Sequence, residues 1–167
     1  AELTVRIDQI AFVNPAGGEV PAELLDSLSG IQAPGGQQNL EMVCNIRDAA
    51  NNALRKDGWI ASVQIPQQEL VDTLQLNVVS ARLSEIRIVG NAGPFRDQFA
   101  SQVSALRDFY PLNERDAEIV LLIADEIPGI SLELSLAPGS AGPGDVIGNL
   151  AVDFEPYSAV LNTRKYN

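Results

Sequence analysis

The chain has 167 residues, of which 46% are hydrophobic, and its 22 acidic residues outnumber its 11 basic ones, giving a net charge of -11. This length suits one ordinary domain or two small ones. The negative charge and the scattered Lys and Arg argue against nucleic-acid binding. The absence of histidine leaves little metal chemistry, and no run approaches the roughly 18 apolar residues of a membrane span.

The first predicted strand contains an irregularity that the chain repeats. Its apolar residues change parity between Ile7 and Ile10, and the same break returns 76 positions later, between Leu83 and Ile86. A bulge, or a strand that starts at the change, would explain each break. The repetition predicts two copies of one structural unit.

Two helices are predicted next in the first copy. The first follows Pro21, a residue suited to the first helical turn, and closes at Gly30. The second begins after Asn39, whose side chain can cap it, and ends at Gly58. Its apolar spacing predicts that Cys44 is a small buried core residue, with a reactive or ligating thiol as the alternative.

A β-hairpin follows this helix. Segments 59–65 and 74–78 alternate apolar and polar residues, which is the period-two pattern of half-buried strands. Pro66 has no N–H for a strand ladder and ends the first segment. Trp59 is interpreted either as a residue packed in the core or at a domain junction, or as a contact for a bound partner.

The second copy has the same order of elements. A helix over 95–110 presents one apolar face, and a second helix begins at Asn113 and ends at Pro128-Gly129. Segments 130–136 and 150–154 form its hairpin. The residues of the first helix that are predicted to be buried are Phe95, Phe99, Val103, Leu106 and Tyr110.

The two hairpins can be aligned by their alternating patterns. Trp59 matches Ile130 at an offset of 71, and Leu74 matches Leu150 at an offset of 76. The additional residues fall in the Gly/Pro-rich turn 138–144, where insertions are tolerated. The sequence thus predicts an α+β fold of two tandem β-α-α-β-β units, each a three-stranded mixed sheet with two helices on one face. Unit 1 is assigned to residues 1–80.

Short motifs in a fixed order carry a family resemblance. In unit 1 they are Asn39-Leu40, Gly58-Trp59, Ile65-Pro66-Gln67-Gln68 with Leu70, and Ile86 with Val89-Gly90-Asn91 at the domain junction. In unit 2 they are Pro111-Leu112-Asn113, Glu114-Arg115, Leu121-Leu122, Ile127-Pro128-Gly129, and Leu136 with Pro138-Gly139. The set resembles the POTRA (polypeptide-transport-associated) domains of two-partner-secretion transporters in the Omp85 superfamily, over nearly the whole chain.

The chain departs from the family pattern at two places. Asp72-Thr73 stands where the family usually has a turn glycine, and segment 161–167 replaces an acidic-Asn-aromatic entry to the barrel. The resemblance implies that unit 2 covers residues 81–157. It also implies that residues 158–167 start a linker or the first strand of a C-terminal β-barrel.

The resemblance implies a periplasmic, chaperone-like region of a Gram-negative outer-membrane protein translocase. This region would receive an extended secreted polypeptide, such as an adhesin or haemolysin, by β-augmentation. It would then hand the polypeptide to the pore of an outer-membrane β-barrel in the same chain. The lack of histidine, the single cysteine that is expected to be buried and the negative charge predict no enzyme activity, no cofactor, no metal and no nucleic-acid partner.

A sheet covered on one face leaves an edge strand with unpaired N–H and C=O groups that can accept an extended chain. By analogy with the family, this edge is the first strand of each hairpin. A proline at Gln64 or Ser135 is therefore expected to remove an edge donor. The predicted polypeptide-binding residues are Trp59, Ile60, Ser62, Gln64, Ser131, Glu133 and Ser135.

Two other functions remain as alternatives. One is the POTRA region of an outer-membrane protein assembly or scaffold factor. The other is a carboxylate-based hydrolase, for which Asp125-Glu126 or Asp153 with Glu155 are candidate acid pairs, although each lies where surface charge is expected. The many acidic residues are interpreted as a solvated surface, with the steering of a basic partner as the alternative.

Overall fold

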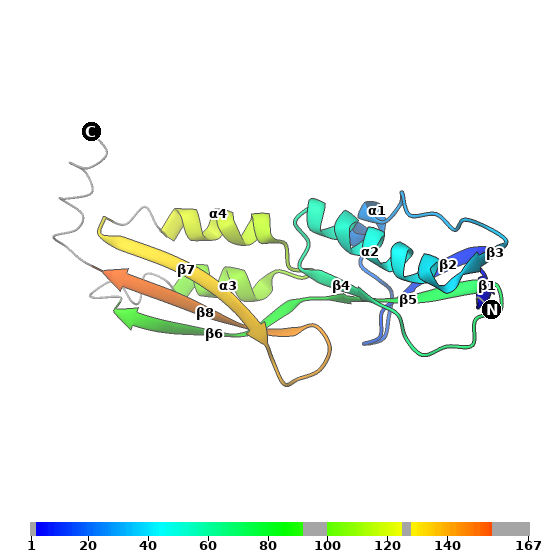
Figure 1. The fold of residues 1–167 in the computed structure, drawn as a ribbon. Helices are drawn as coiled ribbons and strands as arrows, with labels where there is room; N and C mark the ends of the chain where they lie inside the picture. Colours follow the sequence, from blue (N-terminus) through cyan, green and yellow to red (C-terminus); the bar gives the residue numbers. More distant parts are fainter. Residues whose placement is uncertain (1–2, 92–99, 125–127, 155–167) are drawn as a thin grey trace. The chain divides into compact units, whose positions relative to one another are not determined.

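A computed structural model describes residues 3–91, 100–124 and 128–154 of the chain. The chain divides into two compact units, Ala1–Ala81 and Arg82–Asn167, each with its own hydrophobic core (Figure 1). Among the described helices, none is long and apolar enough to cross a membrane.

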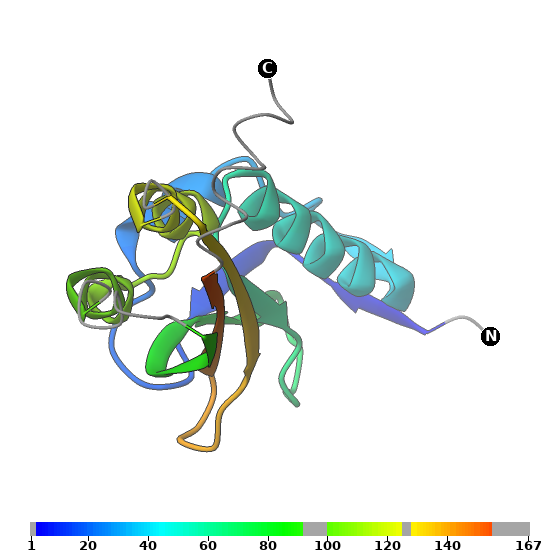
Figure 2. The ribbon, with the colours of Figure 1, turned by 90° about the vertical axis from the view of Figure 1, so that its left-hand side faces the viewer.

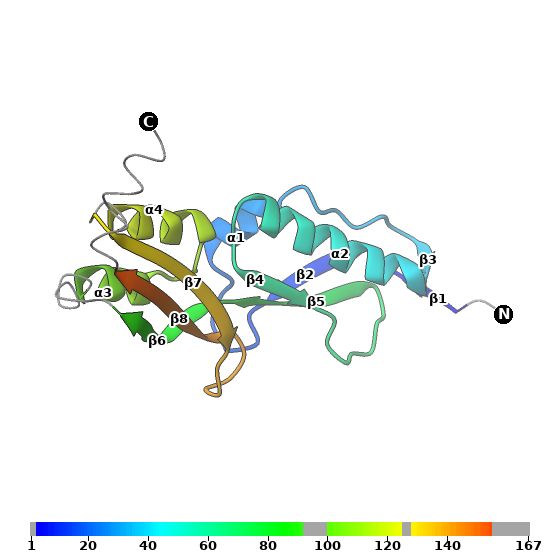
Figure 3. The same cartoon turned by 60° about the vertical axis from the view of Figure 1, so that its left-hand side comes forward.

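Unit 1 is a three-stranded mixed sheet with two helices on one face, as Figure 3 shows. The strand order is β2-β5-β4, and β5 runs parallel to β2 and antiparallel to β4. The predicted fold class is confirmed. The elements of unit 1 are β1 (Thr4–Arg6), β2 (Gln9–Val13), α1 (Ala22–Ser27), β3 (Gln37–Asn39), α2 (Leu40–Lys56), β4 (Ala61–Gln64) and β5 (Thr73–Ser80).

Both ends of α2 agree with the sequence prediction. The Asn39 side chain accepts a hydrogen bond from the Met42 N–H at 3.1 Å and so satisfies one of the unpaired donors of the first turn. At the other end, Gly58 adopts a φ of +86°, a conformation that glycine tolerates best. Local residue chemistry therefore defines this helix.

The prediction that Cys44 is buried is wrong, because Cys44 is exposed. The buried residues of α2 are Val43, Ile46, Ala50 and Leu54, which recur every three or four positions. A helix turns by about 100° per residue, so the residue after Val43 lies at the border of this face.

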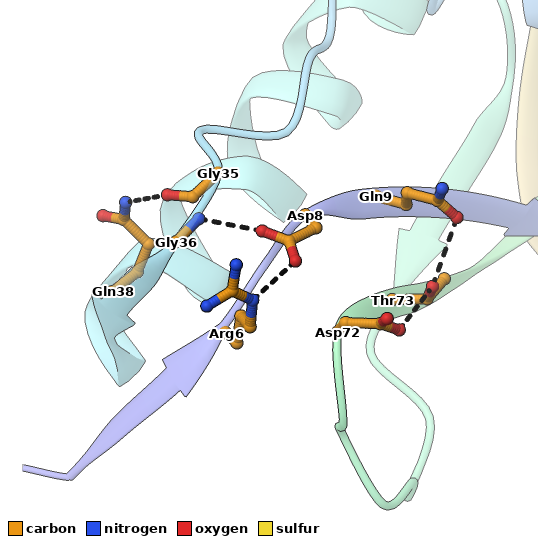
Figure 4. A network of polar contacts seen from close by, with 8 residues as sticks. All are labelled: Arg6, Asp8, Gln9, Gly35, Gly36, Gln38, Asp72 and Thr73. Carbon is orange, nitrogen blue, oxygen red and sulfur yellow. Dashed lines mark hydrogen bonds and ion pairs between the residues drawn. The ribbon is translucent and has the colours of Figure 1, made fainter.

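The N-terminal part of unit 1 contains a ribbon that the sequence did not predict. β1 pairs antiparallel with β3 and lies outside the three-stranded sheet, and β2 starts after the parity break, at Gln9. Figure 4 shows the Asp8 carboxylate between Arg6 and the Gly36 backbone. Asp8 accepts from the Gly36 N–H at 2.9 Å and from the Arg6 guanidinium at 2.6 Å.

These contacts predict a pH dependence of the ribbon. The pKa of Asp8 lies below its ordinary value, first because of the Gly36 N–H and then because of Arg6. A carboxyl group with a depressed folded pKa stabilises the fold above its unfolded pKa of about 3.9 and loses that contribution as the pH falls through the folded value. We expect the hydrogen-exchange protection of the Gly36 amide to be constant above about pH 5 and to fall as the pH drops below about 4.

The matched control is Asp8→Asn, which keeps the size of the side chain and removes its titration. This variant should show reduced protection of Gly36 that no longer changes across the acid range. Protection that falls equally in both proteins would contradict a role for the Asp8 carboxylate.

Unit 2 repeats the architecture of unit 1. Its strand order is β6-β8-β7, with β6 parallel and β7 antiparallel to β8. Figure 2 shows α3 and α4 on the same side of this sheet. The elements are β6 (Arg82–Asn91), α3 (Ala100–Asp108), α4 (Glu114–Ala124), β7 (Ile130–Pro138) and β8 (Asp145–Phe154).

The first strand of unit 2 contains a bulge, one of the two explanations predicted for the parity break. The register of β6 against β8 shifts between Leu83 and Glu85, which is a bulge, whereas unit 1 starts a new strand at the equivalent point. The assignment of Gly90-Asn91 to a domain junction is wrong. These residues end β6 inside unit 2, and the division between the units falls after Ala81.

The predicted apolar face of α3 is confirmed in part. Leu106 is fully buried and Val103 packs against the core of unit 2. Tyr110 is 41% exposed, against the prediction, and its ring lies 4.1 Å below the Arg82 guanidinium. The other two residues of this predicted face, Phe95 and Phe99, lie outside the described residues.

Candidate functional site

The first strand of each hairpin lies at an edge of its sheet. β4 is one edge of unit 1 and β7 is one edge of unit 2. In an antiparallel ladder, the N–H and C=O of one residue point to the same side, and successive residues alternate between the partner strand and the open edge. Only every second residue of such a strand therefore directs its backbone groups outward.

In β4, the backbone of Val63 points outward and is occupied by a side chain of α2. The Val63 N–H donates to Oδ1 of Asn51 at 2.7 Å, and Nδ2 of Asn51 donates to the Val63 C=O at 3.1 Å. By alternation, Ala61 also faces outward, whereas Ser62 and Gln64 face β5. The expectation that a proline at Gln64 removes an edge donor is therefore wrong, because that N–H belongs to the ladder.

In β7, a hydrogen bond at the end of the hairpin shows which residues direct their backbone groups toward β8. The Gly139 N–H donates to the Asp145 C=O at 2.8 Å, so Gly139 faces β8. The register is unbroken along β7, and Ser135 therefore also faces β8, which makes the proline expectation wrong there too. Pro138, which has no N–H, falls at an outward position. The outward residues are Ile130, Leu132, Leu134, Leu136 and Pro138.

Strand pairing aligns the two units more reliably than the alternating pattern does. Phe12 pairs with Leu76 in unit 1. Ile88, the predicted counterpart of Phe12, pairs with Leu150 in unit 2. The central strands are therefore offset by 74 positions, from Leu76 to Leu150, and the sequence alignment at 76 was wrong by two.

The same correction applies to the edge strands. Val63 pairs with buried Val78, and Leu132 pairs with Val152, which is buried at the matching position of β8. Val63 and Leu132 are thus equivalent, at an offset of 69 rather than the predicted 71. Both direct their backbone groups outward, which agrees with this alignment.

A groove lies between α4 and Leu132, the residue equivalent to Val63. It has a volume of about 220 Å³ and is lined by Glu118, Leu121, Leu122 and Leu132. Leu122 is 65% exposed, and α4 carries further exposed apolar side chains beside it. Among the described residues, no side chain is hydrogen-bonded to the backbone of Leu132. Within the described part of unit 2, the groove thus combines an unpaired strand edge with apolar surface.

The side chains predicted to bind polypeptide lie mainly on the open face of each sheet. Ser62 and Gln64 are exposed opposite α2, as are their counterparts on β7. Ser131 and Glu133 line a shallow hollow of about 300 Å³ on this open face of unit 2. Ser135 is exposed on the same strand. The sequence therefore identified the strands but not the residues whose backbone is outward.

Trp59 and Ile60 precede β4. The Trp59 indole packs against the core of unit 1, and its Nε1–H donates to the Ser27 hydroxyl at 3.0 Å. The Ser27 hydroxyl in turn donates to Asp57 at 2.6 Å. The Ile60 C=O accepts from the Ala81 N–H at 2.9 Å and so belongs to the interior ladder. These contacts give Trp59 a packing role.

The candidate acids of a hydrolase do not come together in the described structure. Asp153 is exposed at the end of β8. The remaining candidates, Asp125, Glu126 and Glu155, lie outside the described residues. Among the residues that the structure describes, no three acidic, cysteine or histidine side chains are grouped as metal ligands.

Asn51 is the residue that sequence analysis missed. It follows buried Ala50 and precedes buried Leu54 by three positions, so it lies at the border of the buried face of α2. The sequence offers only this helical position as a signal. Its partner on β4 becomes visible only when helix and strand are placed together.

Comparison with known proteins gives structural matches only, since no family model and no curated protein matches the chain. CdiB from Escherichia coli matches with a TM-score of 0.69 at 18% identity, over 90% of this chain and 27% of CdiB. The N-terminal domain of Omp85 from Thermosynechococcus elongatus matches with a TM-score of 0.62 at 16% identity, over 90% and 67%. POTRA1-3 of the periplasmic domain of Omp85 from Anabaena matches with a TM-score of 0.51 at 17% identity, over 91% and 62%.

The chain has the fold of tandem POTRA domains. The resemblance inferred from the motifs is thereby confirmed at the level of the fold. The chain spans about a quarter of the length of CdiB, with 27% of that protein covered.

Proposed function

We propose that this POTRA region binds an extended exported polypeptide by β-augmentation, in the periplasm, as part of an outer-membrane protein translocase. It then passes the polypeptide to the pore of a β-barrel that belongs to the same protein and follows the two units. The similarity to CdiB and to Omp85 supports this setting. The observation that carries the proposal is the outward backbone of β7 beside the α4 groove.

Strand addition on β7 uses backbone groups that have no strand partner among the described residues. An incoming strand pairs with alternate residues of β7, beginning at Leu132 and continuing to Leu134 and Leu136. Side chains of that strand alternate between the two faces of the sheet, so one of them enters the groove lined by Leu121 and Leu122. Backbone hydrogen bonds supply affinity, and the groove selects an apolar side chain.

The charge of the chain favours a partner with basic residues. Glu118 lines the groove, Glu133 is exposed on the open face of β7, and the net charge is -11. Such a surface attracts a positively charged segment and speeds its association. The expected cargo therefore alternates apolar residues with polar or basic ones.

A second candidate function is the binding region of an outer-membrane protein assembly factor. The similarity to Omp85 N-terminal domains favours it. The binding mode is the same, and the two functions differ in whether the bound polypeptide is exported or inserted. In neither is the chain an enzyme.

The proposal is tested with a probe peptide and Leu136→Pro. The probe is as long as β7 (nine residues), alternates valine with threonine, and ends in lysines. Proline at this edge position removes one outward donor without breaking the ladder to β8. Binding measured by fluorescence anisotropy should weaken about fivefold, since one net hydrogen bond contributes about 1 kcal/mol.

The matched control is Leu136→Ala, which removes the 36% exposed side chain but keeps the N–H. It should bind the probe more tightly than the proline variant. A second control is the same peptide with alternate backbone nitrogens methylated, which should not bind. Equal binding of both peptides would show that apolar burial alone holds the probe, and the proposal of strand addition would fail.

A further inference from the structure

We propose that the Asn51 side chain replaces a partner strand on β4 and closes the edge of unit 1, so that the polypeptide adds to unit 2 alone. This inference rests on the proposed function, because it concerns which of the two equivalent edges accepts a strand. It assigns a specificity role to one residue of α2.

The Asn51 amide satisfies the two groups that an added strand would use. Its carbonyl oxygen accepts from the Val63 N–H at 2.7 Å, and its NH2 donates to the Val63 C=O at 3.1 Å. A neighbouring strand forms the same pair of bonds with one outward residue. The bonds are partly buried, so a strand that displaces Asn51 must also provide new partners for its amide.

The length of the two edges increases the contrast. β4 has four residues, and its outward positions are Ala61 and Val63. With Val63 occupied, only Ala61 is left, which is too short a ladder to hold an extended chain. β7 has nine residues, and among them Leu132, Leu134 and the residues beyond offer several successive outward pairs.

Unit 2 has no equivalent closure in its described part. Leu132 corresponds to Val63, and the α4 residues that border it are Glu118, Leu121 and Leu122. Two of these cannot hydrogen-bond, and a carboxylate could satisfy only the N–H. Beside Leu132, these residues line a groove of about 220 Å³.

The occupant that fits this groove is an extended segment of another polypeptide that carries Lys or Arg beside an apolar side chain. The Glu118 carboxylate at the groove supplies the complementary charge. A second copy of this chain fits less well, because each copy carries a net charge of -11 and β7 would bring a second Glu133 to the same edge.

The test opens the closed edge. Asn51→Ala removes both bonds to Val63, and Asn52→Ala makes the same change one residue later, at an exposed position where the Asn52 side chain accepts from the Arg55 guanidinium at 3.4 Å. Without a probe, the Val63 amide should exchange at least about tenfold faster in Asn51→Ala, because two hydrogen bonds of about 1 kcal/mol each are lost. Asn52→Ala should leave that rate unchanged.

The lysine-ended valine–threonine probe is then added to each protein, and amide protection is read at β4 and β7 by NMR. In the unchanged chain and in Asn52→Ala, we expect protection at Leu132 and none at Ala61. In Asn51→Ala, we expect protection at both, with two probes bound per chain. Asn51→Asp, which keeps the acceptor for the Val63 N–H, provides an intermediate variant if Asn51→Ala folds poorly.

Two results would overturn the inference. One is protection of Ala61 by the probe in the unchanged chain. The other is an Asn51→Ala variant that still binds a single probe, at Leu132. Both outcomes leave the proposed function intact as long as Leu132 is also protected, because β7 then still binds the probe. Loss of probe binding at Leu132 in every protein would instead defeat the proposed function. Analytical ultracentrifugation of the proteins without probe tests whether a second copy of the chain occupies β7 instead. Dimers formed through β7 would overturn the proposal that the partner is a different polypeptide.

Discussion

Gly90→Ala should destabilise unit 2 by about 3 kcal/mol or more, the largest effect that we expect from a single added methyl group. Gly90 has a φ of +96°, a conformation that costs a residue with a Cβ about 1–2 kcal/mol. In addition, a Cβ at this position would lie 2.3 Å from the Val152 carbonyl oxygen of β8. The methyl group can be accommodated only if β6 and β8 separate where Gly90 pairs with Val152.

Gly142→Ala separates the two causes. Gly142 has a φ of +124°, but nothing lies within 4 Å of an added Cβ. This variant should therefore lose only about 1–2 kcal/mol of backbone strain. Chemical denaturation of both variants measures the difference. A Gly90→Ala variant that costs no more than Gly142→Ala would contradict the close approach of Gly90 to the Val152 carbonyl oxygen.

Leu76→Ala should lower the free energy of unfolding of unit 1 by about 2–5 kcal/mol. Leu76 is fully buried on the central strand β5, paired with Phe12 of β2 and directed into the core under the helices. Removing its side chain leaves a cavity that two strands and α2 cannot fill without moving. Thermal or urea unfolding, followed by the fluorescence of Trp59 in the same unit, measures the loss.

The control is Val71→Ala in the turn before β5. Val71 is 74% exposed, so its truncation should change the stability by less than about 0.5 kcal/mol. A similar loss in both variants would mean that the apolar residues of β5 do not form the core of unit 1.

Features fixed by local chemistry were predicted correctly. The cap at Asn39 and the glycine at 58 define α2 through their own backbone and side-chain properties, which need no tertiary partner. The alternation of segment 74–78 likewise predicts a half-buried strand, and Leu74, Leu76 and Val78 are all buried. The order of elements followed from these local signals and from the repeat.

The alignment of the two units was wrong by two residues for a physical reason. Side chains in a strand alternate with a period of two, so a shift of two residues leaves the apolar pattern unchanged. Only the pairing with a neighbour distinguishes the possibilities, and the Leu132–Val152 pair identifies Leu132 as the counterpart of Val63. This pairing is a tertiary property.

The edge strands of the two sheets were predicted from the sequence, whereas the residues that direct their backbone groups outward were missed. The exposed side chains of Ser62 and Ser131 mark the open face of each sheet, whereas the proposed strand addition uses backbone groups of Val63 or Leu132, whose side chains lie on the covered face. The direction of these groups depends on strand order. The hydrogen bonds from Asn51 depend on how α2 lies along β4, which no local pattern encodes.

Hydrogen exchange at the Leu132 amide, with and without the lysine-ended valine–threonine probe, tests the central claim most directly. Strand addition on β7 predicts that this amide exchanges readily in the free protein and becomes protected when the probe binds, while the inward-facing Glu133 amide changes little. Saturating probe that leaves the Leu132 amide unprotected would contradict the proposal that β7 accepts an extended polypeptide.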